Sequence, residues 1–286
     1  SSLFYSELAD EINLNSGGVN FSVLSYPSLE NSDDFTGMFA ASVRVLCEKL
    51  DFGFSILGEI LKTSVFDDTK RLSEIINETK SRAQMRLNAS GHSAAVTRGT
   101  SYFSAASAYN DVTGGIAYYQ FLEHLARNFE EKKEEIAGKL RKTAERLFTS
   151  DNMTVSFTAD SKGYEKMKAP LKQLKEMLPE TGGERYSFTA AKENRNEGFM
   201  TSSQVNYVAR CGTFAGSGYR YTGALKTLKV ILGYDYLWLN VRVKGGAYGV
   251  MNGAGRTGEG YFVSYRDPNL RETDRVYEGI VKYLEE

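Results

Sequence analysis

The spacing of apolar residues changes repeatedly along the chain between the period of a strand and the period of a helix. Val19, Phe21 and Val23 alternate with polar residues, and so do residues 39–45, which predicts two strands that pair antiparallel. Helical spacing of apolar side chains instead covers residues 5–15, 50–61, 72–87 and 115–148. Mixed periods of this kind predict an α+β fold.

The alternation restarts after Ser150, where we expect a second unit to begin. Residues 153–159 alternate as a strand does, and Asp160 or Ser161 can cap the helix that follows. The remaining expected elements are a polar loop at 181–199, strands at 205–211, 247–251 and 260–266, with a hairpin turn at 252–253, a long helix at 222–243 and a final helix capped by Asp267.

These patterns predict two related α+β units, residues 1–150 and residues 151–286. Each unit would carry an antiparallel or mixed sheet with helices packed on one face. The first unit opens on a helix and the second ends on one, so we expect both units to be truncated. The chain would then be a piece of a longer polypeptide.

Charge and composition argue against several classes of protein. With 35 Lys and Arg residues against 36 Asp and Glu residues, the net charge is −1, so we expect no nucleic-acid partner. No segment reaches the roughly 18 consecutive apolar residues of a membrane span, so we expect no membrane partner. The two cysteines, Cys47 and Cys211, form no C-x-x-C pair. This favours a reducing compartment, the cytoplasm or alternatively an organelle matrix.

The two histidines offer little for metal binding or acid–base catalysis. Residues 120–124 resemble the zinc motif H-x-x-E-H, but Gln120 replaces the first histidine and is a poor zinc ligand. His92 is expected to form a hydrogen bond within the fold or to cap a helix. A hydrolase that uses His92 or His124 remains an alternative, because the members of a Ser-His-Asp triad need not be neighbours in sequence. Residues 253–258 match G-x-G-x-x-G but precede a strand, which predicts a hairpin tip rather than a nucleotide site.

The junction at residues 241–249 is the most specific local feature. Arg242 is expected in the last turn of the long helix, on the same side as Trp238, and Tyr248 follows on a strand flanked by glycines. A guanidinium and a phenol are donors suited to a peptide carbonyl or to the oxyanion formed from it, and both could face one cavity. Alternatively, Arg242 interacts with the C-terminal carbonyls of the helix and Tyr248 only packs.

Several segments spread along the chain form a recognisable series when they are taken in order. They are 11–18, 65–72, 90–92 with Arg98, 220–225, 234–238, 242–249 and 264–269. Together they resemble the presequence protease branch of the insulinase/pitrilysin zinc metallopeptidases, the inverzincins, and in particular its C-terminal half. The resemblance covers essentially the whole chain.

The resemblance implies four related α+β units in two halves that close around a chamber. Zinc is held in the N-terminal half by H-x-x-E-H and a later glutamate, and the C-terminal half contributes an arginine and a tyrosine to the substrate. Arg242 and Tyr248 fall on those two positions. Residues 1–150 would be the latter part of the third unit, and residues 151–286 the first part of the fourth.

The resemblance therefore predicts a fragment of a zinc metalloendopeptidase that degrades unfolded peptides. Because H-x-x-E-H is absent, the chain should bind no zinc and be inactive alone, and it should act with a peptide substrate and the N-terminal catalytic half of the same polypeptide. The alternative is a zinc-less relative that binds peptides or serves assembly. The sequence upstream of Ser1 would distinguish the two.

Overall fold

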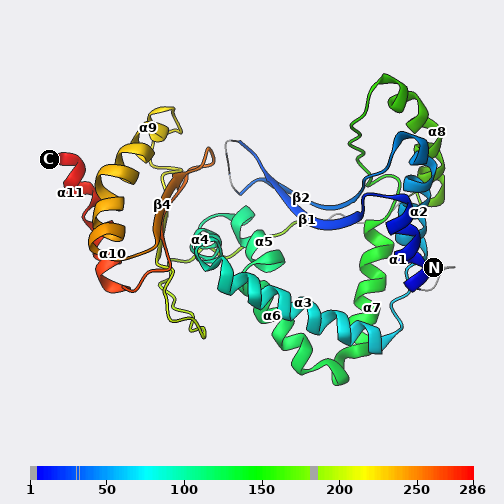
Figure 1. Cartoon of the computed structure of the whole chain (residues 1–286), viewed down its shortest axis with the longest axis horizontal. Helices are drawn as coiled ribbons and strands as arrows, with labels where there is room; N and C mark the ends of the chain where they lie inside the picture. The colour runs from blue at the N-terminus through cyan, green and yellow to red at the C-terminus, as the bar shows by residue number, and fades with distance from the viewer. Residues whose placement is uncertain (1–4, 30, 32, 181–185) are drawn as a thin grey trace. The chain divides into compact units, whose positions relative to one another are not determined.

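The computed structural model describes residues 5–29, 31, 33–180 and 186–286 (Figure 1). The chain divides into two compact units. The first unit consists of Ser1–Val23, Phe39–Ile76 and Leu125–Ser187, and the second unit consists of Leu24–Met38, Asn77–His124 and Phe188–Glu286. Compactness follows spatial contacts, whereas the boundary expected at residue 150 rests on sequence pattern and resemblance, so that boundary stays a prediction.

Helices and two small sheets make up the described residues, which confirms the α+β class. The helices are α1 (Tyr5–Asn15), η1 (Cys47–Lys49), α2 (Leu50–Thr63), α3 (Thr69–Ala89), α4 (Gly91–Ser101), α5 (Ala105–Gly114), α6 (Ile116–Arg127), α7 (Phe129–Leu147), α8 (Ser161–Met177), α9 (Ala224–Ile231), η2 (Leu232–Lys244), α10 (Arg271–Glu278) and α11 (Ile280–Glu285). The strands are β1 (Val19–Pro27), β2 (Phe35–Val43), β3 (Ala209–Thr213), β4 (Gly249–Ala254) and β5 (Glu259–Tyr265). Across these described segments, no helix combines the length and the apolar character that a membrane crossing requires.

In the first unit, the core forms between α3 and α7. Ile76 of α3 and Phe129 and Ile136 of α7 make a buried cluster, against which Leu72 and Leu140 pack. These residues have the helical spacing on which the prediction of amphipathic helices rests. The helix predicted at 115–148 is divided, because α6 ends at Arg127 and α7 begins at Phe129.

Helix α8 packs against α2 in the same unit. The side chain of Asp160 caps α8 by accepting a hydrogen bond from the N–H of Gly163 at 2.7 Å, which confirms the predicted cap. The end of the Met177 side chain lies at Gly58 of α2, where a Cβ would come within 2.9 Å of it. The glycine therefore allows the two helices to approach closely.

The strand predicted at 153–159 is wrong, since these residues join no sheet. Alternation of side chains is only half of what a strand needs, because its backbone must also pair with a neighbouring strand. Only Met153 and Phe157 of the expected inner face are half-buried, while Val155 is exposed. Of the loop predicted at 181–199, residues 186–199 contain no helix or strand and residues 181–185 lie outside the described residues.

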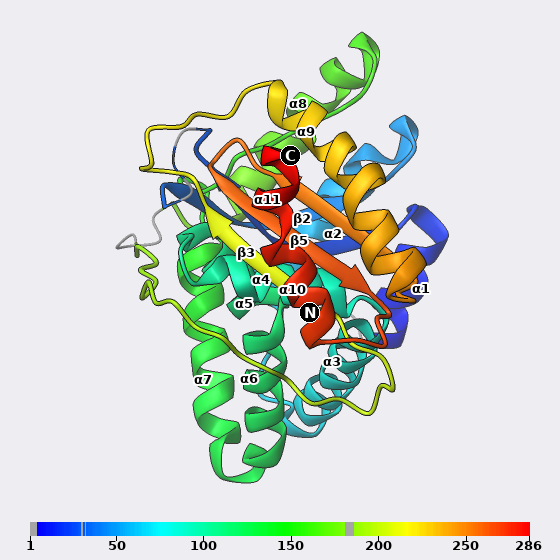
Figure 2. The same cartoon turned by 90° about the vertical axis from the view of Figure 1, so that its left-hand side faces the viewer.

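In the second unit, β3, β5 and β4 form an antiparallel sheet in that order, with Ala209 opposite Val263 and Gly249 opposite Tyr265. Helices contact both of its faces (Figure 1). On β3, Arg210 reaches α10, and the next residue, Cys211, faces α4. Because successive strand residues point to opposite faces, α10 and α4 lie on opposite sides of the sheet. Figure 2 shows α10 and α11 in front of it. The sequence pattern predicted helices on one face only.

Two predicted boundaries in this sheet move. The strand expected at 205–211 is β3 at 209–213, and Asn206, just before it, forms only an isolated bridge to Asp267. The predicted hairpin exists, but β4 continues through residues 252–253 and the chain turns at residues 255–258. Gly258 supplies the positive φ, +98°, that this turn requires.

The helix over 222–243 is continuous, as predicted, but its second part is the π-helix η2. Its buried residues are Leu232, Leu237 and Val241, spaced by five and then four positions. That spacing fits a helix with i→i+5 hydrogen bonds and roughly 4.4 residues per turn. The α-helical pattern placed Leu239 and Val243 on the buried face, and these are 43% and 61% exposed. This part of the prediction is wrong because it assumed the α-helical period.

The final helix does not begin at Asp267, which corrects the predicted cap, because α10 starts at Arg271. Asp267 is fully buried. Its carboxylate accepts hydrogen bonds from the N–H of Asn269 at 2.9 Å and from the hydroxyl of Thr273 at 2.7 Å. Asp267 therefore anchors the segment between β5 and α10 instead of capping the helix.

Candidate functional site

The junction at residues 241–249 lies where η2 ends and β4 begins. Val241 and Ala247 are 1% and 3% exposed and belong to the core cluster of the second unit. Gly246 adopts φ +78°, a conformation that favours glycine, so the chain can reverse here. The N–H groups of Gly246 and Ala247 donate to the carbonyls of Arg242 and Val241 at 2.9 and 3.1 Å. The last carbonyls of the helix are thus satisfied by the backbone.

Arg242 is held between two aromatic side chains. Its guanidinium carbon lies 4.1 Å from the ring centroid of Trp238 and 5.7 Å from that of Tyr248. Nη1 donates to the backbone carbonyl of Tyr248 at 2.9 Å. The alternative that Arg242 satisfies the helix carbonyls therefore does not describe its hydrogen bond. Cation–π contact and this bond fix the guanidinium but use only one of its five N–H donors.

Tyr248 is held by its backbone and leaves its side chain open. Its N–H donates to the carbonyl of Arg266 at 3.2 Å. Its ring meets Tyr265 edge-on at a centroid distance of 6.0 Å, yet the residue is 67% exposed. Within the described ranges, no protein group forms a hydrogen bond with its hydroxyl. The phenol is therefore positioned and has its proton available for another molecule.

The structure thus brings together the two residues predicted as substrate contacts. It also adds Trp238, Tyr265 and Arg266, which the sequence analysis did not assign to the site. Trp238 is the only tryptophan in the chain and precedes Arg242 by one helical turn, so its place beside Arg242 could be predicted. Nothing local identifies Tyr265 or Arg266, since only the pairing of β4 with β5 brings them beside Tyr248.

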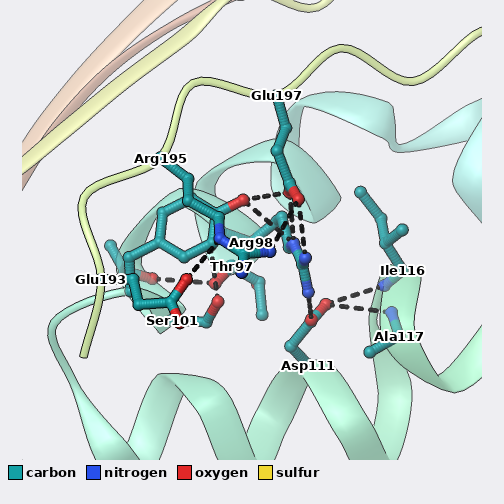
Figure 3. A network of polar contacts seen from close by, with 11 residues as sticks. Thr97, Arg98, Ser101, Asp111, Ile116, Ala117, Glu193, Arg195 and Glu197 are labelled. Carbon is teal, nitrogen blue, oxygen red and sulfur yellow. Dashed lines mark hydrogen bonds and ion pairs between the residues drawn. The ribbon is translucent and has the colours of Figure 1, made fainter. Parts of the chain in front are cut away.

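A second arginine, Arg98 of α4, lies at the centre of a different polar cluster (Figure 3). Nη1 donates to Asp111 at 2.8 Å, and Nε and Nη2 donate to the two oxygens of Glu197 at 2.8 and 3.1 Å. Asp111 is 1% exposed and also accepts from the N–H of Ile116 at 2.9 Å. Tyr102 hydrogen-bonds to Glu197 as well. The charge of Arg98 is thus matched by two carboxylates.

Protonation follows from that arrangement. The hydrogen bond from Arg98, ahead of that from Tyr102, lowers the pKa of Glu197 to about 2. The same contact with Glu197 raises the pKa of Arg98. Arg98 and Glu197 therefore stay ionised near neutral pH. This closed network joins α4, α5 and the segment around residue 197, and it directs its hydrogen bonds inward rather than toward a ligand.

The remaining candidates do not assemble into a catalytic centre. His92 lies in the first turn of α4 with its ring edge-on to Tyr265 at 4.9 Å, and Nδ1 is buried without a hydrogen bond. Burial lowers the pKa of His92. His124 lies on another helix, α6. Both cysteines are free, and burial raises the pKa of the Cys211 thiol to about 12, so that thiol is a poor nucleophile.

Zinc, which the resemblance implies, needs three or four His, Cys, Asp or Glu ligands. In the part of the chain that the structure describes, no group of three such side chains could hold a metal ion. These residues therefore do not fit a zinc site, and we route no catalytic step through a metal. That the chain itself binds no zinc stays a prediction.

Comparison with known proteins bears on this geometry. A family model for a peptidase-associated region matches residues 1–125, and the model "PreP C-terminal domain" matches residues 196–286. Arg242 and Tyr248 lie within the second match.

Individual relatives agree over nearly the whole chain. "Protein HypA" of Clostridium perfringens is 36% identical over 280 residues, 98% of this chain and 29% of the relative. "Presequence protease 1, chloroplastic/mitochondrial" of Arabidopsis thaliana is 27% identical over 284 residues, 99% of this chain and 26% of the relative. "Presequence protease, mitochondrial" of Yarrowia lipolytica is 29% identical over 280 residues, 93% of this chain and 27% of the relative. The chain thus spans less than a third of each relative's length, and together with the two models these matches identify it as a C-terminal region of the presequence protease family of peptidases.

Proposed function

We propose that this chain is the non-catalytic C-terminal part of a zinc metalloendopeptidase that degrades unfolded peptides, and that it contributes chamber wall and substrate contacts. The observation that carries the proposal is the pairing of Arg242 with Tyr248. A guanidinium with unused N–H donors and an exposed phenol stand side by side on a rigid junction. The relatives named as presequence proteases support a peptide as the ligand of these donors.

In this proposal the two residues have different tasks. The hydroxyl of Tyr248 donates to the scissile carbonyl oxygen as that oxygen gains negative charge in the tetrahedral state. Arg242 donates to a carbonyl of the substrate backbone and steadies Tyr248 through its bond to the Tyr248 carbonyl. A donor aimed at developing charge stabilises the transition state more than the ground state, so it raises turnover rather than affinity.

The metal and the nucleophile belong to the other half of the polypeptide in this proposal. Zinc would be bound there, where it would polarise the scissile carbonyl and activate water. This chain alone would be inactive and would need the N-terminal catalytic half as its partner. The compartment, cytoplasm or organelle matrix, stays a prediction, and two relatives carry mitochondrial or chloroplastic names.

The test is Tyr248→Phe in a polypeptide that contains this chain and the region before it. Removing one hydroxyl should lower kcat on the order of 100-fold with little change in KM, because the lost bond forms mainly in the transition state. Tyr219→Phe is the matched control, since Tyr219 is 77% exposed and lies outside the junction. An unchanged kcat for Tyr248→Phe removes the proposed role. Peptide binding without hydrolysis by the wild-type polypeptide would favour the zinc-less binding protein.

A further inference from the structure

Arg266, one residue beyond β5, has an unusual backbone conformation. In the described residues it is the only non-glycine residue with positive φ, at +49°. The left-handed region costs a residue with a Cβ on the order of 1 kcal/mol or more, and such residues gather at functional sites. Glycine would adopt this conformation without that cost. The arginine side chain is therefore the feature that needs an explanation.

The sheet register places Arg266 directly beside the proposed site. Gly249 of β4 pairs with Tyr265 of β5, so the next step along both strands brings Tyr248 opposite Arg266. The N–H of Tyr248 donates to the Arg266 carbonyl at 3.2 Å, which extends the ladder by one bond. The backbone of Arg266 thus helps to position Tyr248.

The side chain of Arg266 adds a positive charge to the same group of residues. Its guanidinium carbon lies 5.5 Å from the ring centroid of Tyr265, and that ring lies 6.0 Å from the ring of Tyr248. Arg266 is exposed, and no carboxylate in the described ranges pairs with it. The neighbouring Asp267 is fully buried and bonded to Asn269 and Thr273.

Other cations near the junction also have neutral rather than acidic partners. Arg242 bonds to a backbone carbonyl and Lys244 to the amide oxygen of Asn240. By contrast, Arg210 on the same sheet is paired with Asp274 and Glu278 at 3.0 and 3.1 Å. The surface around Tyr248 is therefore locally positive although the whole chain has a net charge of −1.

We propose that Arg266 is a third substrate contact, which binds a carboxylate of the peptide held at Tyr248. A guanidinium stacked on an aromatic ring keeps its N–H edges free, and their fork matches a carboxylate. The carboxylate is either the C-terminus of the peptide or an acidic side chain. The inference rests on the proposed function, because it assumes that a peptide lies at Arg242 and Tyr248.

The test uses Arg266→Gly in the longer polypeptide, since glycine keeps the left-handed backbone and removes the charge. Two pairs of peptides separate the sources of the carboxylate: one pair ends in a free acid or an amide, and the other carries Glu or Gln at one internal position. KM should rise roughly fivefold for the acidic member of one pair and stay unchanged for its neutral counterpart. Arg266→Asn, which also tolerates positive φ, should reproduce the result.

Arg256→Gly is the matched control, because Arg256 is an exposed arginine in the turn at the far end of β5. It should alter neither peptide pair. Equal changes in KM for the acidic and neutral peptides would overturn the inference, since Arg266 would then act on the backbone alone. The two proposals remain distinguishable because Tyr248→Phe should lower kcat for all four peptides, whereas Arg266→Gly should change KM for acidic ones only.

Discussion

Arg98 and Arg242 are both helical arginines of the second unit, and both lie against an aromatic ring, yet their surroundings differ. Arg98 stacks on Tyr102 at 5.3 Å and bonds to the carboxylates of Asp111 and Glu197 (Figure 3). Arg242 stacks on Trp238 at 4.1 Å, and its hydrogen bond goes to a neutral backbone carbonyl. The first charge is neutralised within the protein, and the second is not.

The difference separates an arginine that holds the fold from one that is available to a ligand. A buried carboxylate without its cation is costly, so Asp111 and Glu197 depend on Arg98. Within the described residues, no carboxylate depends on Arg242 in this way, and its remaining donors stay open to another molecule. Substitutions at the two positions should therefore have opposite effects on stability and on activity.

The largest expected effect is on stability at Arg98. Arg98→Met should lower the free energy of unfolding by about 3 to 5 kcal/mol, because Asp111 is 1% exposed and would lose its cationic partner. Urea unfolding followed by circular dichroism measures this change. Arg242→Met is the matched control and should cost less than about 1 kcal/mol. Equal losses for the two variants would break the distinction.

The second effect is on catalysis at Arg242. Arg242→Lys keeps the charge but loses the planar fork that stacks on Trp238 and reaches the Tyr248 carbonyl. In the longer polypeptide we expect a decrease in kcat on the order of 100-fold, or about 2.7 kcal/mol, with an unchanged unfolding midpoint. Steady-state hydrolysis of a fluorogenic peptide measures it. A variant that loses stability and activity together would make Arg242 structural, like Arg98.

A smaller effect concerns the pH dependence of the Arg98 cluster. The hydrogen bond from Arg98 lowers the pKa of Glu197 from its ordinary 4.5 to about 2. Since the folded pKa is depressed, the stabilisation is complete above about pH 4.5 and is lost as pH falls toward 2. Glu197→Gln should cost roughly 1.5 kcal/mol at pH 6 and progressively less below pH 4.5. Urea midpoints from pH 6 to pH 2.5 test this, and a cost that stayed constant with pH would assign it to shape rather than charge.

Much of the fold can be predicted from the sequence because amphipathic helices and hairpins carry local signals. The periods at 50–61 and 72–87, the cap at Asp160 and the hairpin between β4 and β5 all correspond to observed structure. Pairing between distant segments leaves no such signal. The failed strand at 153–159 alternates correctly but joins no sheet, and Arg98 gives no local indication that it will meet Glu197.

The candidate site was predictable in its residues but not in its geometry. Arg242 and Tyr248 follow from their residue types and from the resemblance, whereas their neighbours depend on how the helix winds and how β4 pairs. An α-helical period puts Leu239 and Val243 in the core, but the π-helix puts Leu237 and Val241 there, at 0% and 1% exposure. The outward face of η2, which carries Trp238 and Arg242, is therefore set by the π period.

The smallest effect tests whether this winding matters for the site. Trp238→Ala should lower kcat roughly fivefold, because Arg242 would keep its bond to Tyr248 but lose the ring on which it stacks. Trp238→Phe should restore most of the activity, since a smaller aromatic face still attracts the guanidinium. Because Trp238 is 42% exposed, neither change should alter the unfolding midpoint by much. If alanine and phenylalanine lowered kcat equally, the ring would not position Arg242, and the π-helix would serve only to bury Leu237 and Val241.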